Sequence, residues 1–113
     1  MEIRRFEKED WYPYAGAEEF RKDEPPFILE LELQYNAEAC IIADKNGIQV
    51  TIGSGAVEVA WMKQVELDPL RAEGELRAIA KAVENITYAP DLAYEFDHPS
   101  TEALKGFQYC GTF

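Results

Sequence analysis

The sequence is poor in the residues from which metal and catalytic sites are most often built. It has a single histidine, His98, and two cysteines, Cys40 and Cys110, that lack the close spacing of a zinc or redox motif. A glycine-rich stretch at 53–55 precedes a predicted strand, and not the helix start that a phosphate-binding loop requires. No apolar run approaches the roughly 18 residues of a membrane-spanning helix. The sequence therefore predicts no metal site, no cofactor, no catalytic site and no membrane span.

Basic residues are also scarce relative to acidic ones. Only 11 Lys and Arg stand against 22 Asp and Glu, which leaves a formal net charge of −11 on 113 residues. An excess of this size repels nucleic acids and anionic membrane surfaces, and it attracts basic partners. Since the sequence has no basic stripe either, we expect no direct contact with nucleic acid or membrane. A basic protein is the partner that this charge favours.

Hydrophobic residues are abundant enough for a folded core. They make up 47% of the sequence, and 12% of the residues are aromatic, which is too much for a disordered acidic tail. We expect residues 1–113 to form a single α+β domain, with residues 1–26, where the pattern is least regular, as an N-terminal flap. No hydrophobic core of a signal peptide follows the first residues. We therefore expect a cytoplasmic protein whose Cys40 and Cys110 are small core residues, with a disulfide or a metal-binding pair as the alternative.

Alternating apolar and polar residues predict most of the strands. The clearest pattern begins at Phe27, where Leu29, Leu31, Leu33 and Tyr35 alternate with polar neighbours. We expect further strands over 39–44, 48–52, 57–67, 92–96 and 107–113, besides a short one over 3–6. Hairpin-linked strands followed by one helix indicate an antiparallel sheet of about five strands with one main helix packed on one face.

The main helix is predicted to start at Asp68. This residue fits the N-cap position, and Pro69 fits the first helical position, where an N–H group is not needed. Apolar residues then recur at three- and four-residue spacing and form one stripe, at Leu76, Ile79, Ala80, Val83 and Ile86. The stripe predicts that one side of this helix lies against the sheet.

The turns decide which side chains share a face of the sheet. Asn46 and Gly47 fit a two-residue hairpin turn, which would pair Ala43 with Val50. An odd loop or bulge at Asn36 is then needed to keep the apolar side chains together. We expect the helix to cover Leu29, Leu31, Leu33, Ile41, Val50, Ile52, Val59 and Trp61. The opposite face would present to solvent Glu30, Glu32, Gln34, Ile42, Gln49, Thr51, Glu58, Ala60, Met62, Gln64 and Glu66.

This acidic face favours a binding function, in which carboxylates steer a basic partner and apolar members anchor it. Small size, high acidity and the lack of a catalytic motif are typical of immunity proteins that neutralise toxin nucleases. They are also typical of phage proteins that block nucleic-acid-handling defence complexes, although this is a likeness in type and not a sequence match. We therefore expect a non-enzymatic inhibitor that mimics nucleic acid and occupies the basic, nucleic-acid-binding surface of a partner such as a nuclease. The expected contact residues are Glu30, Glu32, Glu58, Glu66, Met62 and Trp11.

Two other hypotheses fit the same sequence. In the first, the chain is an accessory or homo-oligomeric α+β domain of unknown role, and its acidity serves only solubility. Alternatively, it is a small ligand-binding protein or enzyme with a pocket near Tyr94, Glu95, Asp97 and His98. A histidine beside acids can act as a general base, but a lone histidine without further ligands is more simply a solvated loop residue.

Overall fold

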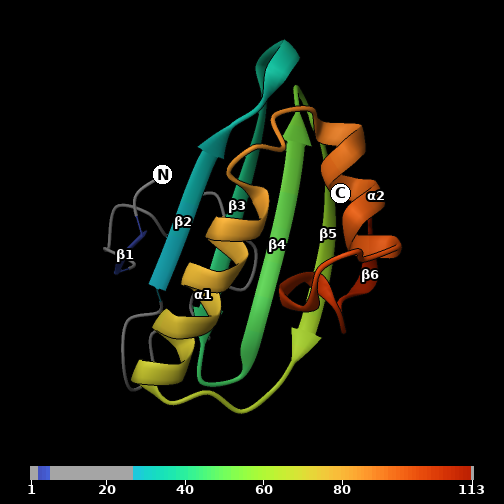
Figure 1. Cartoon of the computed structure of the whole chain (residues 1–113). Coiled ribbons are helices and arrows are strands. Elements are labelled where there is room, and N and C mark those ends of the chain that lie inside the picture. Colours follow the sequence, from blue (N-terminus) through green and yellow to red (C-terminus); the bar gives the residue numbers. More distant parts are fainter. Residues whose placement is uncertain (1–2, 6–26, 113) are drawn as a thin grey trace.

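The computed structural model, which describes residues 3–5 and 27–112, contains an antiparallel sheet with its strands in chain order (Figure 1). The strands are β1 (Ile3–Arg5), β2 (Phe27–Glu32), β3 (Ala37–Asp44), β4 (Gly47–Ser54), β5 (Val57–Gln64) and β6 (Gln108–Thr112). Each strand pairs with the next one along the chain. The predicted α+β class, an antiparallel sheet with one main helix on one face, is confirmed.

Helix α1 (Pro69–Val83) is the main helix, and it begins where the sequence predicted. The Asp68 side chain accepts a hydrogen bond from the Arg71 N–H at 2.9 Å and so caps the first turn. The buried residues of α1 are Ala72, Leu76, Ile79 and Val83, at the spacing of one helix face. This face packs on the central strands, as Figure 1 shows.

Helix α2 (Ala89–Asp97) replaces the strand predicted over 92–96, so that prediction was wrong. The apolar residues of this segment fit both the strand period and the helix period. Leu92 and Phe96 are four residues apart, which is two repeats of a strand and about one turn of a helix. A helix start settles the choice: Pro90 lies in the first turn and Asp91 follows it. Leu92 and Phe96 are both buried, whereas Tyr94 is 61% exposed.

The β2–β3 loop contains a short 3₁₀ turn, η3 (Gln34–Asn36), where the sequence predicted a strand as far as Tyr35. The last pair of the β2–β3 ladder is Glu32 with Glu38, and the Leu33 N–H donates to the Ala37 carbonyl at 2.8 Å. The loop therefore has an odd number of residues, which confirms the odd loop predicted at Asn36. It places Leu29 and Ile41 on the face covered by α1.

The β3–β4 hairpin turns one residue earlier than predicted. Asp44 pairs with Gly47, so Lys45 and Asn46 form the turn, and the Asp44 carboxylate accepts hydrogen bonds from the N–H groups of Asn46 and Gly47 at 2.8 and 3.1 Å. Gly47 lies at φ 139° in β4, where a Cβ would collide with the Lys63 carbonyl oxygen. The predicted pairing of Ala43 with Val50 was therefore wrong by two residues. A two-residue shift preserves the faces, so the assignment of apolar side chains to the α1 side still holds.

The face away from α1, called here the outer face, is less open than predicted. It carries exposed Glu30, Glu32, Glu38, Glu58 and Met62, but Ile28, Cys40, Ile42 and Ala60 on the same face are buried. Ile42, expected in solvent, is only 2% exposed. The outer face is therefore acidic and accessible at one end of the sheet, and apolar and buried towards its middle.

The two cysteines lie in different environments, and no disulfide joins them. Cys40 is buried in β3, as predicted, whereas Cys110 is exposed on the edge strand β6. The prediction that Cys110 is a core residue was wrong, because β6 is exposed along most of its length.

Candidate functional site

Three glutamates form a row across the outer face at the end of the sheet that carries the β2–β3 loop. Glu32 lies directly opposite Glu38, Glu38 lies opposite Gly53, and Gly53 lies opposite Glu58. All three glutamates are exposed. We call Glu32, Glu38 and Glu58 the acidic row.

Gly53 leaves a gap in this row. It has no side chain between Glu38 and Glu58, and a Cβ there would approach the Glu58 Cγ to 3.1 Å. A hollow of about 580 Å³ lies over this end of the outer face. Its described walls include the acidic row together with Glu30, Asn36, Cys40 and Thr51. We call this space the acidic hollow.

The charges around the acidic hollow are all of one sign among the described residues that line it. Side chains directly opposite on paired antiparallel strands are about 4.5–5.5 Å apart at Cβ, and like charges in that position repel each other. The Glu32–Glu38 pair therefore lowers the stability of the free protein. A cation placed between the two carboxylates relieves that repulsion, so the arrangement favours binding of Lys or Arg side chains.

The structure brings some of the predicted contact residues together and separates others. Glu30, Glu32 and Glu58 line the same hollow. Met62 is 38% exposed but lies four residues farther along β5 from Glu58, about 13 Å at the usual rise of a strand. Glu66 lies beyond the end of β5, in the link to α1, where its carbonyl accepts from Arg71.

Of the predicted contact residues, Trp11 lies outside the described residues. Glu38 was missed by the sequence analysis, although the odd loop at Asn36 already implied that it shares the face of Glu32. It occupies the centre of the acidic row and is the residue that sequence reasoning could have added.

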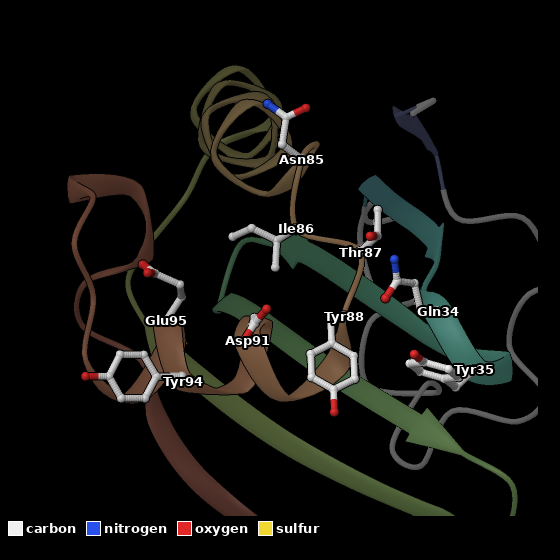
Figure 2. Close-up of a pocket in the computed structure, with 9 residues that line it drawn as sticks. All are labelled: Gln34, Tyr35, Asn85, Ile86, Thr87, Tyr88, Asp91, Tyr94 and Glu95. Atoms are coloured by element: carbon white, nitrogen blue, oxygen red, sulfur yellow. The ribbon is translucent and has the colours of Figure 1, made fainter.

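A second cavity, of about 470 Å³, lies beside the β2–β3 loop (Figure 2). Its walls are the loop, the connection between α1 and α2, and the first turns of α2. The lining residues are Gln34, Tyr35, Asn85, Ile86, Thr87, Tyr88, Asp91, Tyr94 and Glu95. The rings of Tyr35 and Tyr88 meet edge to face, with centroids 5.8 Å apart. We call this space the tyrosine pocket.

The predicted pocket near His98 is only partly reproduced. Tyr94 and Glu95 line the tyrosine pocket, but Asp97 and His98 do not. The Asp97 carboxylate accepts a hydrogen bond from the Trp61 indole, and the His98 ring stacks on Tyr94 with centroids 4.5 Å apart. Because the segment is helical, Glu95 and Asp97 point in different directions and do not form the carboxylate pair that a strand would give.

Neither helix in the described part of the chain is long and apolar enough to cross a bilayer. Within residues 3–5 and 27–112, no group of three or more His, Cys, Asp or Glu side chains is arranged to hold a metal ion. The described residues thus form two separate hollows, the acidic hollow, in which every charged wall residue is a glutamate, and the tyrosine pocket, which is walled by tyrosines and acids.

The chain was compared with protein-family models, with curated proteins and with solved structures, and none of them matches it.

Proposed function

We propose that the protein is a non-enzymatic binding protein that occupies a basic, nucleic-acid-binding surface of another protein. The observation that supports this proposal is the acidic row, in which three exposed glutamates lie on neighbouring strands around Gly53. The net charge of −11 adds a long-range attraction to basic surfaces.

The mechanism is competition for cationic side chains. Neighbouring strands are about 4.8 Å apart, so a sheet holds carboxylates at fixed, short separations. In the complex, the glutamates of the acidic row take the places that phosphate groups take on the same surface, and each accepts charge-assisted hydrogen bonds from Lys or Arg. The sheet supplies this arrangement without ordering a loop at the moment of binding, which keeps the entropic cost of association low.

Apolar anchoring plays a smaller part than the sequence suggested. Ile42, expected to be an anchor, is buried, and Met62 lies away from the acidic row. A complex held mainly by exposed charges associates quickly and weakens as salt is added. Binding that depends strongly on salt is therefore the expected signature of this site.

The test needs a partner and two variants of equal charge. Proteins captured on the full chain from a host lysate are identified by mass spectrometry, purified, and measured for their dissociation constant. The first variant combines Glu32→Gln, Glu38→Gln and Glu58→Gln in the acidic row. The matched control combines Glu75→Gln in α1, Glu84→Gln at the C-cap of α1 and Glu102→Gln in the 3₁₀ turn η4 (Glu102–Leu104), so both variants change the formal net charge from −11 to −8.

We expect the acidic-row variant to bind at least about tenfold more weakly than the control. The wild-type affinity should fall by a similar factor between about 50 and 200 mM salt, and the wild type should displace a DNA or RNA duplex from the partner. Equal binding by the two variants would show that only the net charge matters. Affinity unchanged by salt, or no displacement of nucleic acid, would overturn the proposal.

A further inference from the structure

We propose that the tyrosine pocket is a binding site for a guanidinium group. This inference is independent of the acidic row, because the tyrosine pocket and the acidic hollow share no lining residue among the described ones. It rests on three observations about the pocket: the placement of Tyr35, the availability of the Asp91 carboxylate, and the set of acceptors that surround them.

Tyr35 is held in an unfavourable backbone conformation although its side chain is not needed for the core. Its φ and ψ are 61° and 41°, in the left-handed region that bulky residues rarely adopt. Its ring is 80% exposed and contacts the ring of Tyr88. The Gln34 N–H donates to the Thr87 carbonyl and so fixes the loop against the α1–α2 connection. The fold therefore presents an accessible aromatic surface at the rim of the pocket.

Asp91 supplies the negative charge. It is exposed, and no hydrogen bond or ion pair with another described residue engages its carboxylate. Glu95, the other acid of the pocket, accepts hydrogen bonds from the Ser100 hydroxyl and N–H at 2.7 and 3.2 Å. Figure 2 shows Asp91 beside Tyr88, near the middle of the pocket, while the Tyr94 ring points away from both. Asp91 is thus the carboxylate placed to meet a ligand.

The chemistry of the walls favours a guanidinium over other small groups. The described lining contains two acids and no Lys or Arg, which excludes an anion. A guanidinium is planar, stacks on tyrosine rings, and pairs with a carboxylate through two parallel hydrogen bonds. Its remaining N–H groups match the side-chain oxygens of Gln34 and Thr87, whereas an ammonium group offers only a compact point charge.

The guanidinium has two possible sources, a free arginine-like metabolite or an arginine side chain of a protein. The test is an NMR titration of the full ¹⁵N-labelled chain with three probes. L-arginine represents the metabolite, N-acetyl-arginine methylamide represents the side chain in a protein, and N-acetyl-lysine methylamide is the control for charge alone. The backbone signals of Tyr35, Tyr88 and Asp91 report on the pocket.

We expect saturable shifts at these positions with a dissociation constant on the order of 1 mM for an arginine probe, and binding of the lysine probe at least about fivefold weaker. Tighter binding of L-arginine would indicate a metabolite, and tighter binding of the blocked arginine would indicate a protein side chain. Equal affinity for arginine and lysine probes, or shifts that do not saturate, would overturn the proposal.

Two variants and one control locate the site. Asp91→Asn removes the charge and Tyr88→Leu removes the ring, and each should weaken arginine binding by about fivefold or more. Glu66→Gln changes the net charge by the same amount as Asp91→Asn but lies at the far end of β5, so it should bind as the wild type does. Thermal unfolding of each variant confirms that it is folded. Unchanged binding by a folded Asp91→Asn would refute the proposal, and the acidic-row variant should keep full arginine binding.

Discussion

The indole N–H of Trp61 donates a hydrogen bond to the Asp97 carboxylate at 2.7 Å and so joins β5 to the last residue of α2. The Trp61 ring also stacks on Phe96, with centroids 5.6 Å apart. These two contacts hold α2 against the sheet. The position of the tyrosine pocket depends on them, because Tyr88, Asp91 and Glu95 are carried by that helix or its cap.

Asp97→Ala should lower the free energy of unfolding by about 1–3 kcal/mol, because it leaves the part-buried Trp61 N–H without its acceptor. Asp97→Asn keeps an oxygen in the same place and should cost less than half as much. Urea denaturation followed by tryptophan fluorescence measures both. A stability of Asp97→Ala equal to that of the wild type would show that the hydrogen bond does not hold α2 in place.

Asp44 should make the stability depend on pH in an unusual direction for an acid. Burial raises the pKa of Asp44 above its ordinary value of 3.8, although the N–H groups of Asn46 and Gly47 and the charge of Lys45 act against this rise. The folded state therefore holds this proton more tightly than the unfolded state does. The contribution of Asp44 to stability grows as the pH falls through the folded-state pKa and levels off below 3.8.

The comparison that isolates this effect is with Asp44→Asn, which cannot titrate. The free energy of unfolding of the wild type, minus that of the variant, should increase as the pH falls from 7 through 4, and it should approach about 1.4 kcal/mol for each unit of pKa difference once the pH is below 3.8. Urea midpoints at several pH values measure it. A difference that stays constant or decreases towards pH 4 would contradict the predicted direction.

Glu38→Lys should stabilise the free protein while weakening its binding to a basic partner. The substitution replaces the Glu32–Glu38 repulsion by an attraction between paired strands, a change of about 0.2–1 kcal/mol. Thermal unfolding at low salt measures the gain, which should shrink at high salt. A loss of stability would mean that the two carboxylates do not repel each other in the folded protein.

Tyr35 should reverse the usual order of alanine and glycine substitutions. At most positions the variant with alanine is more stable than the variant with glycine, because glycine gives the unfolded chain more conformational freedom to lose on folding. At φ 61° glycine avoids the strain that a Cβ imposes, so Tyr35→Gly should be more stable than Tyr35→Ala by about 1 kcal/mol. Both variants lose the same contact with Tyr88. If alanine were the more stable, the loop would not hold the conformation described.

Ile42→Ala should cost about 2–4 kcal/mol, although the residue lies on the outer face. Met62→Ala, two strands away on the same face and 38% exposed, should cost less than about 1 kcal/mol. Chemical denaturation of both variants tests whether the middle of the outer face is buried. Equal and small losses would indicate an open face, as the sequence alone suggested.

The local pattern was sufficient for several features of this fold. Alternation of apolar and polar residues located β2 to β5, and Asp68 with Pro69 located the start of α1. The need to keep Leu29 and Ile41 on one face predicted the odd loop at Asn36. These features were predictable because strand period, helix capping and face parity depend on neighbours within a few residues.

The structure of the 92–96 segment and the register of the β3–β4 hairpin could not be predicted from the local pattern, because each depends on contacts with other parts of the molecule. Leu92 and Phe96 suit a strand or a helix equally well, and packing on Trp61 and the start at Pro90 select the helix. The Asp44 carboxylate, by bonding two N–H groups, selects a hairpin register two residues from the predicted one. Here, several local arrangements are close in energy, so contacts elsewhere decide between them.

The two candidate sites depend partly on the local sequence pattern and partly on tertiary contacts. The sequence by itself determined that the chain is acidic, and it predicted that Glu30, Glu32 and Glu58 share a face of a sheet, since the alternation within each strand and the lengths of the turns between strands are local features. Only the tertiary structure decided that Glu66 is excluded from the acidic row and that Tyr35 meets Tyr88. Contacts between residues far apart in the chain depend on how the elements pack, and no local pattern encodes that packing.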